Sequence, residues 1–383
     1  MSPSVALAVL AAAAWAWLLL ARGGFWRIER ATVAPAPVRW PVVTAVIPAR
    51  DEADVIGETV WSLLGQDYRG VLSVVVADDG SADGTAEEAR QAARLAGAGD
   101  RLAVVTVPPL PPGWAGKVWA QSQGIETAVQ AHPDTELWLL TDADILHASD
   151  EIGRLVARLL AERLDMASLM VRLSTASLAE KAVVPAFVFF FRLLFPFRWV
   201  GDPGRATAAA AGGCMLIRRS ALERAGGLAS IQGALIDDCA LAARIKASGG
   251  RLALDLADET ASLRRYATFT GLWRMIARSA YTQLRLSPFL LAGTVAAMTV
   301  GFLLPPLFVV LGGAARPPAL VAWAEMSVAF VPMLRYHRLP AVAAPLLPLV
   351  ASFYLGATID SARRHWAGRG GEWKGRVRER NHP

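Results

Sequence analysis

The segment LLTDADIL, residues 139–146, places Asp142 and Asp144 directly after an apolar run that is typical of a buried strand. Two carboxylates about 4 Å apart repel each other by roughly 4 kcal/mol at an effective dielectric near 20. The pair therefore needs a compensating charge, unless it simply lies in a turn at the surface. Side chains two positions apart in an extended segment point the same way, so both aspartates can approach one divalent cation.

Similar apolar runs alternate with amphipathic stretches on the N-terminal side of this segment. Continuous apolar strands separated by helices indicate an α/β domain, with a parallel sheet covered on both faces. Ligands of such sheets bind beyond the carboxyl ends of the strands. We expect strands at 42–48, 72–77, 102–107 and 136–141, and helices at 49–66, 85–96 and 116–130.

Acidic residues follow three of these expected strands. Because the carboxyl ends of parallel strands meet at one edge of a sheet, we expect these residues to share one site. Asp51 is also placed to cap the helix that it precedes. The acidic residues are Asp51 after the first strand, Asp78 and Asp79 after the second, and Asp142 and Asp144 after the fourth.

The segment VADDGSADGT, residues 76–85, allows several familiar sites to be tested. An EF-hand loop that began at Asp79 would have Arg90 where a bidentate glutamate is required. The turn after the first strand lacks the glycines of a dinucleotide fold, and the sequence has neither a complete phosphate loop nor a G-x-S-x-G elbow. A plain hydrophilic turn, with Thr85 and Glu88 as a capping box, remains an alternative that does not explain the paired aspartates.

The chain contains, in this order, IPARDEAD (47–54), VADDGSADGT (76–85), DAD (142–144), GGCMLI (212–217) and IDDCALA (236–242). Over roughly residues 42–286, this set resembles the inverting family 2 glycosyltransferases, which have the GT-A fold. The segments PPGWAGKVWA (111–120) and WKGR (373–376) look most like the hopene-associated membrane glycosyltransferases, and the carotenoid glycosyltransferases are similar relatives.

The resemblance implies a Rossmann-like mixed sheet with helices on both faces and a nucleotide-sugar donor at its edge. By this resemblance, Asp51 and Asp79 contact the nucleoside, Asp79 through the base, and Lys117 lies near the diphosphate. Asp142 approaches the ribose or the metal, and Asp144 is the metal ligand. The metal is Mg²⁺ or Mn²⁺, hard cations that take oxygen ligands and share them with phosphates.

The same resemblance makes Asp238 the general base. The family has a Glu-Asp pair here, whereas this chain has Asp237 in the first position. Inverting transfer needs one base for the acceptor hydroxyl and an electrophile for the departing diphosphate, so no covalent nucleophile is required. Two acids at the start of a helix also favour the helix dipole, which is a structural alternative that does not exclude catalysis.

A processive synthase is disfavoured because no Q-x-x-R-W run follows the expected base. Residues 264–286 take its place, with Arg274, Arg278 and Arg285 interleaved with apolar residues. This pattern predicts a helix in the membrane surface, or alternatively an ordinary amphipathic core helix. We therefore expect transfer of a single sugar.

The composition indicates a membrane protein, since 54% of the 383 residues are apolar and the mean hydropathy is +0.37. Arg22 and Arg27 follow the first apolar segment and no basic residue precedes it, which favours an anchor with a cytoplasmic domain over a signal peptide. The only cysteines, Cys214 and Cys239, provide no disulfide framework. Segments of spanning length lie at 3–21, 289–312, 318–334 and 339–359.

These observations predict five regions. They are an N-terminal anchor (1–21), a cytoplasmic GT-A domain (40–263), an interfacial amphipathic region (264–288), C-terminal transmembrane segments (289–359) and a basic tail (360–383). The tail has six Arg and one Lys against one Asp and two Glu, which favours the cytoplasm. Residues 183–200 are short for a span and are either an interfacial segment where a lipid docks or a buried helix–loop pair.

The expected function is transfer of one sugar from a nucleotide-diphosphate-sugar to a membrane lipid, in a bacterial-type inner membrane and in hopanoid biosynthesis. Polyprenyl phosphate or a carotenoid is an alternative acceptor, and a scaffold that has lost its chemistry is a further alternative. The net charge of +6 lies largely near the apolar segments and no aromatic-basic motif occurs, so a nucleic-acid partner is not expected.

Overall fold

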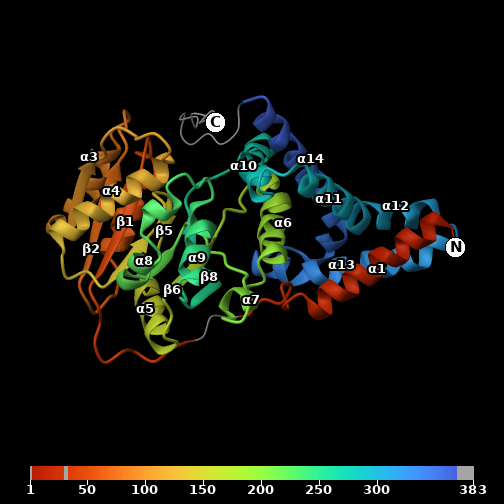
Figure 1. Cartoon of the computed structure of the whole chain (residues 1–383), viewed down its shortest axis with the longest axis horizontal. Coiled ribbons are helices and arrows are strands. Elements are labelled where there is room, and N and C mark those ends of the chain that lie inside the picture. The colour runs from red at the N-terminus through yellow and green to blue at the C-terminus, as the bar shows by residue number, and fades with distance from the viewer. Residues whose placement is uncertain (1, 30–32, 369–383) are drawn as a thin grey trace. The chain divides into compact units, whose positions relative to one another are not determined.

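The computed structural model describes residues 2–29 and 33–368, which form two compact units (Figure 1). We call residues 33–174 and 200–265 the sheet unit. The helical unit consists of residues 2–29, 175–199 and 266–368. The WKGR motif and most of the basic tail lie outside the described residues.

The sheet unit is built on one eight-stranded sheet with the order β3-β2-β1-β4-β7-β6-β8-β5. All four strands expected from the sequence are present and pair in parallel, β3 with β2, β2 with β1 and β1 with β4. The strands are β1 (Val43–Ala49), β2 (Leu72–Asp78), β3 (Leu102–Thr106), β4 (Leu137–Leu140), β5 (Ile145–Leu146), β6 (Met166–Arg172), β7 (Met215–Arg218) and β8 (Leu252–Ser262).

The other half of the sheet makes it mixed. Strand β7 pairs antiparallel with both β4 and β6, and β5 pairs antiparallel with β8, while β6 and β8 are parallel. The helices of the sheet unit are α2 (Ile56–Leu64), α3 (Thr85–Leu95), α4 (Gly116–Ala131), α5 (Glu151–Ala161), α8 (Arg219–Arg224) and α9 (Asp237–Ala247).

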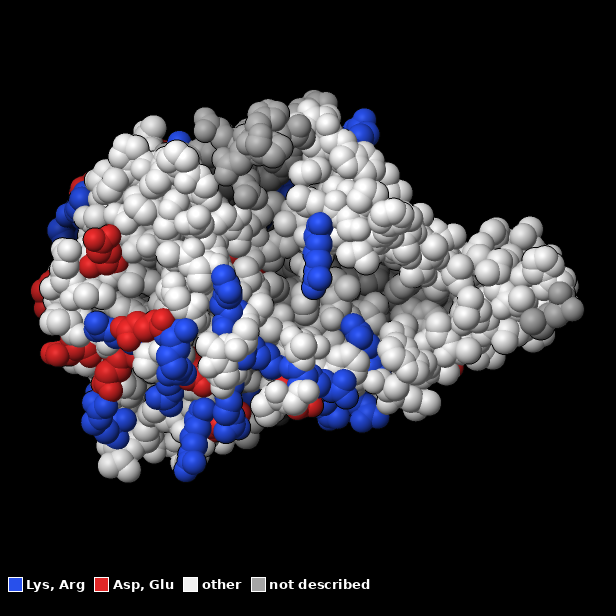
Figure 2. Space-filling view, in the orientation of Figure 1, with Lys and Arg blue, Asp and Glu red and all other residues white. Residues whose placement is uncertain are grey.

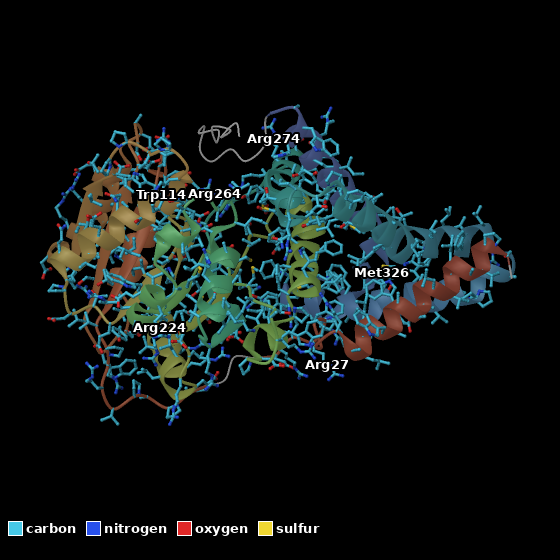
Figure 3. The ribbon with its side chains drawn as sticks, viewed as in Figure 1. Arg27, Trp114, Arg224, Arg264, Arg274 and Met326 are labelled. Atoms are coloured by element: carbon cyan, nitrogen blue, oxygen red, sulfur yellow. The ribbon has the colours of Figure 1, made fainter. Side chains whose placement is uncertain are left out.

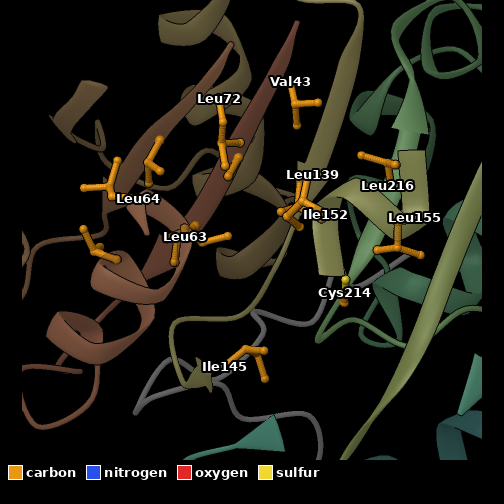
Figure 4. Packing of buried hydrophobic residues seen from close by; sticks show 14 of the residues in the cluster. Val43, Leu63, Leu64, Leu72, Leu139, Ile145, Ile152, Leu155, Cys214 and Leu216 are labelled. Carbon is orange, nitrogen blue, oxygen red and sulfur yellow. The ribbon is translucent and has the colours of Figure 1, made fainter. Parts of the chain in front are cut away.

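Helices cover both faces of the sheet because successive strand residues point to opposite sides. Along β1, Ala45 and Ile47 belong to the large apolar core with α2, α3 and α5 (Figure 4). Val46 faces the other way, where Gly124 of α4 lies directly above it. The parallel strands thus lie between two packed layers.

The expected cap of the first helix is wrong. Helix α2 begins at Ile56 after the N-cap residue Val55, later than the sequence pattern indicated. Asp51 has φ 49° in the left-handed region, and its Oδ1 accepts a hydrogen bond from the backbone N of Ala82 at 2.9 Å. The carboxylate therefore joins two loops at the strand ends instead of capping a helix.

The capping box at the start of α3 is also absent. Its N-cap residue is Gly84, which has φ 94°, and no side chain caps the helix. The Thr85 hydroxyl instead donates to Asp83 Oδ1 at 2.5 Å and accepts from the backbone N of Glu52 at 2.9 Å. The Thr85 hydroxyl therefore bonds to loop residues and is not used to cap α3.

In the helical unit, four of the described helical segments are long and apolar enough to cross a membrane, and they match the four expected spans. On the face seen in Figure 2, the surface over α1 and α12 is almost entirely uncharged. The helices are α1 (Pro3–Ala21), α6 (Leu178–Leu194), α10 (Phe269–Gln283), α11 (Pro288–Met298), α12 (Leu304–Leu311), α13 (Arg316–Tyr336) and α14 (Leu347–Trp366), with the short α7 (Phe197–Gly201) at the unit boundary.

The segment 183–200 forms most of α6 and the start of α7. Ser177 and Glu180 form a complete capping box at the start of α6, and Pro185 is accommodated inside it. The helix contacts α10, α13 and α14 of the same unit, and half of its apolar residues are buried. Its burial agrees with the buried-helix alternative, while a role in lipid docking stays a prediction.

Candidate active site

Lys117 connects two of the acidic motifs. Its Nζ lies 2.7 Å from Asp142 Oδ1 and 3.1 Å from Asp237 Oδ2. The lysine is the second residue of α4, and the backbone N of Ala115 before the helix donates to Gln232 O at 2.7 Å. The end of β4 and the first turns of α4 and α9 are thereby held together.

Asp237 and Asp238 are the first two residues of α9, where the helix dipole favours negative charge. Asp238 accepts hydrogen bonds from the backbone N of Gly212 at 2.9 Å and of Cys239 at 2.7 Å. A Cβ at Gly212 would lie 3.0 Å from Lys117 Nζ and 3.5 Å from Asp238 Oδ2. The GGC motif therefore approaches both charged groups so closely that a side chain at position 212 would press on the end of Lys117.

The pKa of Asp238 is raised to about 6. Burial is the largest cause and the negative charge of Asp237 adds to it, whereas Lys117 and the two backbone N–H donors oppose the shift. The Lys117 ammonium has its pKa raised, because its three carboxylate neighbours outweigh its burial. Asp238 is thus mostly ionised at neutral pH and is a better proton acceptor than an ordinary aspartate.

Asp144 is paired with a different cation. Its Oδ2 accepts from Arg264 Nε at 2.9 Å and from the Ser262 hydroxyl at 3.2 Å. The Nη2 of the same arginine lies 2.8 and 2.7 Å from the two carboxylate oxygens of Glu52. Arg264, which Figure 3 labels, follows the last strand β8. The interfacial region expected from the sequence begins at this residue, and that assignment stays a prediction.

Asp51 and Asp79 lie at the carboxyl ends of the adjacent strands β1 and β2. Arg50 Nη1 donates to the backbone O of Asp79 at 2.6 Å and lies 3.3 Å from its Oδ2. The side chain of Asp79 is only 1% exposed. Both residues are at the expected edge, but no contact links them directly to Lys117 among the described residues.

Asp78, which the hydrophilic-turn alternative left unexplained, has a local role. Its Oδ1 accepts a hydrogen bond from the backbone N of Ser81 at 3.1 Å and a second from the Ser81 hydroxyl. Asp78 therefore closes the turn after β2, and this turn positions Asp79.

Four of the predicted site residues thus form one cluster around the Lys117 ammonium: Lys117 itself, Asp142, Asp237 and Asp238. The other predicted site residues lie along the same edge of the sheet. Residues that the sequence analysis did not assign are adjacent in sequence to those it did: Arg50 and Glu52 flank Asp51. The signal for Arg264 was weaker, because other arginines of the chain, such as Arg219, also follow a strand.

The arrangement supplies a partly buried carboxylate base beside carboxylates that are neutralised by amine and guanidinium groups. Such a set can take a proton from a hydroxyl and hold a polyanion through cations. No group of three or more His, Cys, Asp and Glu side chains suited to a metal occurs within the described residues 2–29 and 33–368. Any ion bound to the DAD segment would need further ligands from a substrate.

No curated protein is significantly similar to the chain. Among solved structures, it is similar to the mannosyltransferase PcManGT from Pyrobaculum calidifontis, in complex with GDP-Man and Mn²⁺, with 21% identity, a TM-score of 0.56 and coverage of 94% of this chain and 98% of that one. This likeness confirms the GT-A fold. The glucosyl-3-phosphoglycerate synthase from Mycobacterium tuberculosis matches at 18% identity and a TM-score of 0.42, covering 68% of this chain and 85% of that chain.

The family described as glycosyltransferase like family 2 matches residues 41–282, which is more than half of the 383 residues. The matched region contains every residue of the site described above, from Arg50 to Arg264. The chain therefore belongs to the glycosyltransferase family 2-like proteins and is a glycosyltransferase.

Proposed function

We propose that the protein transfers a single sugar from a nucleotide-diphosphate-sugar to a membrane lipid with inversion at the anomeric carbon, and that its setting is hopanoid biosynthesis. The observation that carries the proposal is the position of Lys117 between Asp142 and Asp237. This ion pair joins the DAD segment, suited to the diphosphate side of a donor, to the acidic pair that includes the base.

In the proposed reaction, the Asp238 carboxylate removes the proton from an acceptor hydroxyl. The acceptor oxygen forms a bond to the anomeric carbon while the bond from that carbon to the diphosphate oxygen breaks. Backbone N–H groups of Gly212 and Cys239 hold the two Asp238 oxygens in position. Lys117 supplies a positive charge beside the leaving group, where negative charge increases.

The DAD segment fits a divalent metal by its donor chemistry. Asp142 and Asp144 offer carboxylate oxygens, the ligands that Mg²⁺ and Mn²⁺ prefer, and diphosphate oxygens and water would complete the shell. Each carboxylate already pairs with a cation, Lys117 or Arg264, so a metal would share or replace these partners. A bound metal would neutralise the departing diphosphate. The similar mannosyltransferase was solved with GDP-Man and Mn²⁺, which supports this assignment.

The nucleoside would bind at the ends of β1 and β2. Asp51 and Asp79 lie there, and both carboxylates are positioned by backbone and side-chain contacts before any donor is present. Such positioning lowers the entropy lost on binding. We assign Asp79 to the base and Asp51 to the remainder of the nucleoside.

The acceptor assignment rests on the membrane character of the chain and on its PPGWAGKVWA segment. Four apolar helices support a lipid-facing enzyme, and arginines after the first of them support a cytoplasmic sheet unit. The preference for a hopanoid over a carotenoid or polyprenyl phosphate comes from resemblance alone. A lipid hydroxyl would present the proton that Asp238 removes, whereas a phosphate acceptor has less need of a base.

The test is to incubate membranes that contain the protein with a panel of nucleotide sugars and Mn²⁺, and then to identify the glycosylated lipid by mass spectrometry. We expect one sugar on a hopanoid polyol. The Asp238→Asn variant should lose the product. Asp134→Asn changes an exposed aspartate outside the site and serves as the matched control.

Other products would point elsewhere. A sugar on polyprenyl phosphate or a carotenoid would replace the hopanoid acceptor, and a polymer from one donor would identify a processive synthase. An unchanged product with folded Asp238→Asn would contradict the role of the base. No product from any donor would favour the scaffold alternative.

A further inference from the structure

Arg264 connects two carboxylates that come from distant parts of the sheet unit. Its Nε contacts Asp144 and its Nη2 contacts both oxygens of Glu52. The two carboxylate side chains are 11% and 10% exposed, so water screens their charges poorly. The arginine therefore neutralises negative charge at the position where the proposed metal would bind.

The balance of charge in the site favours entry of a further cation. Within the described residues, Lys117 and Arg264 provide two positive charges beside the four carboxylates of Asp142, Asp144, Asp237 and Asp238. This group therefore carries two negative charges in excess when all four carboxylates are ionised. A free diphosphate is repelled by this charge.

The position of Arg264 would also allow its guanidinium to separate from Asp144 while the residue stays in the site. It lies beyond the end of β8 and before α10, in a segment outside regular secondary structure. Its side chain is 38% exposed, and no hydrogen bond involves its Nη1 within the described part of the chain. The N–H groups of Nη1 can therefore donate charge-assisted hydrogen bonds to a phosphate oxygen.

We infer that Arg264 is the resident counterion of Asp144, that a divalent cation displaces it from this carboxylate, and that the displaced guanidinium then binds the diphosphate of the donor. This inference rests on the proposed metal site at Asp142 and Asp144. Arg264 is then a positioning residue with two states. It stabilises the acidic site without metal, and it couples metal entry to recognition of the nucleotide.

A structural role alone would leave a different signature. If Arg264 only fastened Glu52 to Asp144, its removal would loosen the loop and weaken the binding of every ligand. A resident counterion competes with the metal, so its removal strengthens binding of the metal alone. The same removal weakens binding of the nucleotide, because a phosphate ligand is lost. Under the proposed role the two binding constants change in opposite directions, whereas a purely structural role weakens both.

The test uses the purified full chain and two probes, Mn²⁺ alone and then UDP or GDP with saturating Mn²⁺. Electron paramagnetic resonance measures free Mn²⁺, and calorimetry measures the nucleotide. For Arg264→Gln we expect Mn²⁺ to bind about tenfold more tightly, since one nearby positive charge is removed. We expect the better nucleotide to bind about tenfold more weakly, since one charge-assisted hydrogen bond is removed.

Two control variants separate charge from local packing. Ser262→Ala removes the neutral hydrogen bond to the same Asp144 oxygen and the one accepted from the backbone N of Arg264, and should change Mn²⁺ affinity by about twofold or less. Arg154→Gln removes a guanidinium that pairs with Asp258 away from the site, and should change neither constant. If Arg154→Gln binds Mn²⁺ as tightly as Arg264→Gln does, the effect comes from net charge in general. This result would contradict the inference.

Thermal unfolding keeps the test decisive if Arg264→Gln is unstable. Without metal, this variant should unfold at a lower temperature than the unaltered protein, and Mn²⁺ should raise its Tm by more. Arg264→Lys keeps the charge but cannot reach both carboxylates with one planar group. Its Mn²⁺ affinity should lie between that of the unaltered protein and that of Arg264→Gln.

Two failures can be told apart. If the unaltered protein binds no Mn²⁺ with or without either nucleotide, the proposed metal site fails and the inference falls with it. If it binds Mn²⁺ but folded Arg264→Gln binds the ion equally or less tightly, only the role of Arg264 as a competing counterion is overturned. Unchanged nucleotide affinity in that variant would overturn its role as a diphosphate ligand.

Discussion

Asp238 lies between two backbone N–H donors and beside a second carboxylate, and this environment determines how its protonation should limit catalysis. Its pKa, raised to about 6, is the net result of burial and of Asp237, opposed by Lys117. A base acts only when ionised, so acid removes the active form as the pH falls through this value.

We therefore predict an acidic limb in kcat/KM near pH 6, with activity falling about tenfold per pH unit below it. An unperturbed aspartate would place this limb about two pH units lower. The measurement is the pH profile of single-sugar transfer, with Asp134→Asn as a variant that should keep the limb. A flat profile from pH 5 to pH 8 in folded protein would contradict the assignment.

Lys117 lowers the pKa of Asp238 through its positive charge. Replacing Lys117 with Met should therefore raise that pKa further and move the acidic limb to higher pH, in addition to reducing activity. Lys117→Arg retains the charge and should leave the limb close to its original position. The profile of residual activity measures the shift. A limb that does not move in Lys117→Met would mean that the lysine serves the donor alone.

At the scale of elements, the position of α4 depends on close approach to the sheet. A Cβ at Gly124 would lie 2.5 Å from Val46 Cγ1 and 3.3 Å from Ala77 Cβ. The helix can approach β1 and β2 this closely only because residue 124 has no side chain. The same helix carries Lys117 in its first turn, two turns before Gly124, so packing on the sheet determines the geometry of the site.

We predict that Gly124→Ala destabilises the sheet unit by about 1–3 kcal/mol, the usual cost of overpacking a core. Thermal denaturation of the purified protein measures the effect as a lower Tm. Gly99→Ala is the matched control, because a Cβ there meets no atom within 4 Å. Equal Tm values for the two variants would show that the helix moves away from the sheet at little cost.

The elements also show where local patterns fail. The expected strands are present because their apolar runs are continuous, and the helix at 116–130 is present as α4. The expected caps at Asp51 and Thr85 are absent, because both side chains bond to a neighbouring loop instead. A short polar side chain bonds equally well to a local or a distant backbone group, and only tertiary proximity decides which group is available.

At the scale of the whole molecule, the chain combines one α/β unit with a set of apolar helices. Four described helices of spanning length predict that the protein stays with the membrane after extraction with alkaline carbonate, which removes proteins bound by charge alone. The measurement is the fraction of protein in the membrane pellet. Release into the supernatant would show that these helices pack without crossing the bilayer.

The orientation of the tail gives a second prediction at this scale. Residues 360–383 carry seven basic residues against three acidic ones, so the tail should lie on the cytoplasmic side. A protease added to inverted vesicles should then remove a C-terminal tag. A protected tag, with the sheet unit cut in the same vesicles, would place the tail outside and would favour three crossings after residue 288.

The sequence by itself determined the α/β class, the four parallel strands, the apolar helices and the acidic residues at the strand ends. Each of these follows from periodicity or from neighbouring residues in the chain. Only the tertiary structure decided that β7 enters antiparallel beside β4 and that residues 175–199 join the helical unit. It also decided that Arg264 pairs with Glu52 and Asp144, 212 and 120 positions away. Such long-range pairs leave no local pattern, because they depend on which surfaces meet when the whole chain packs.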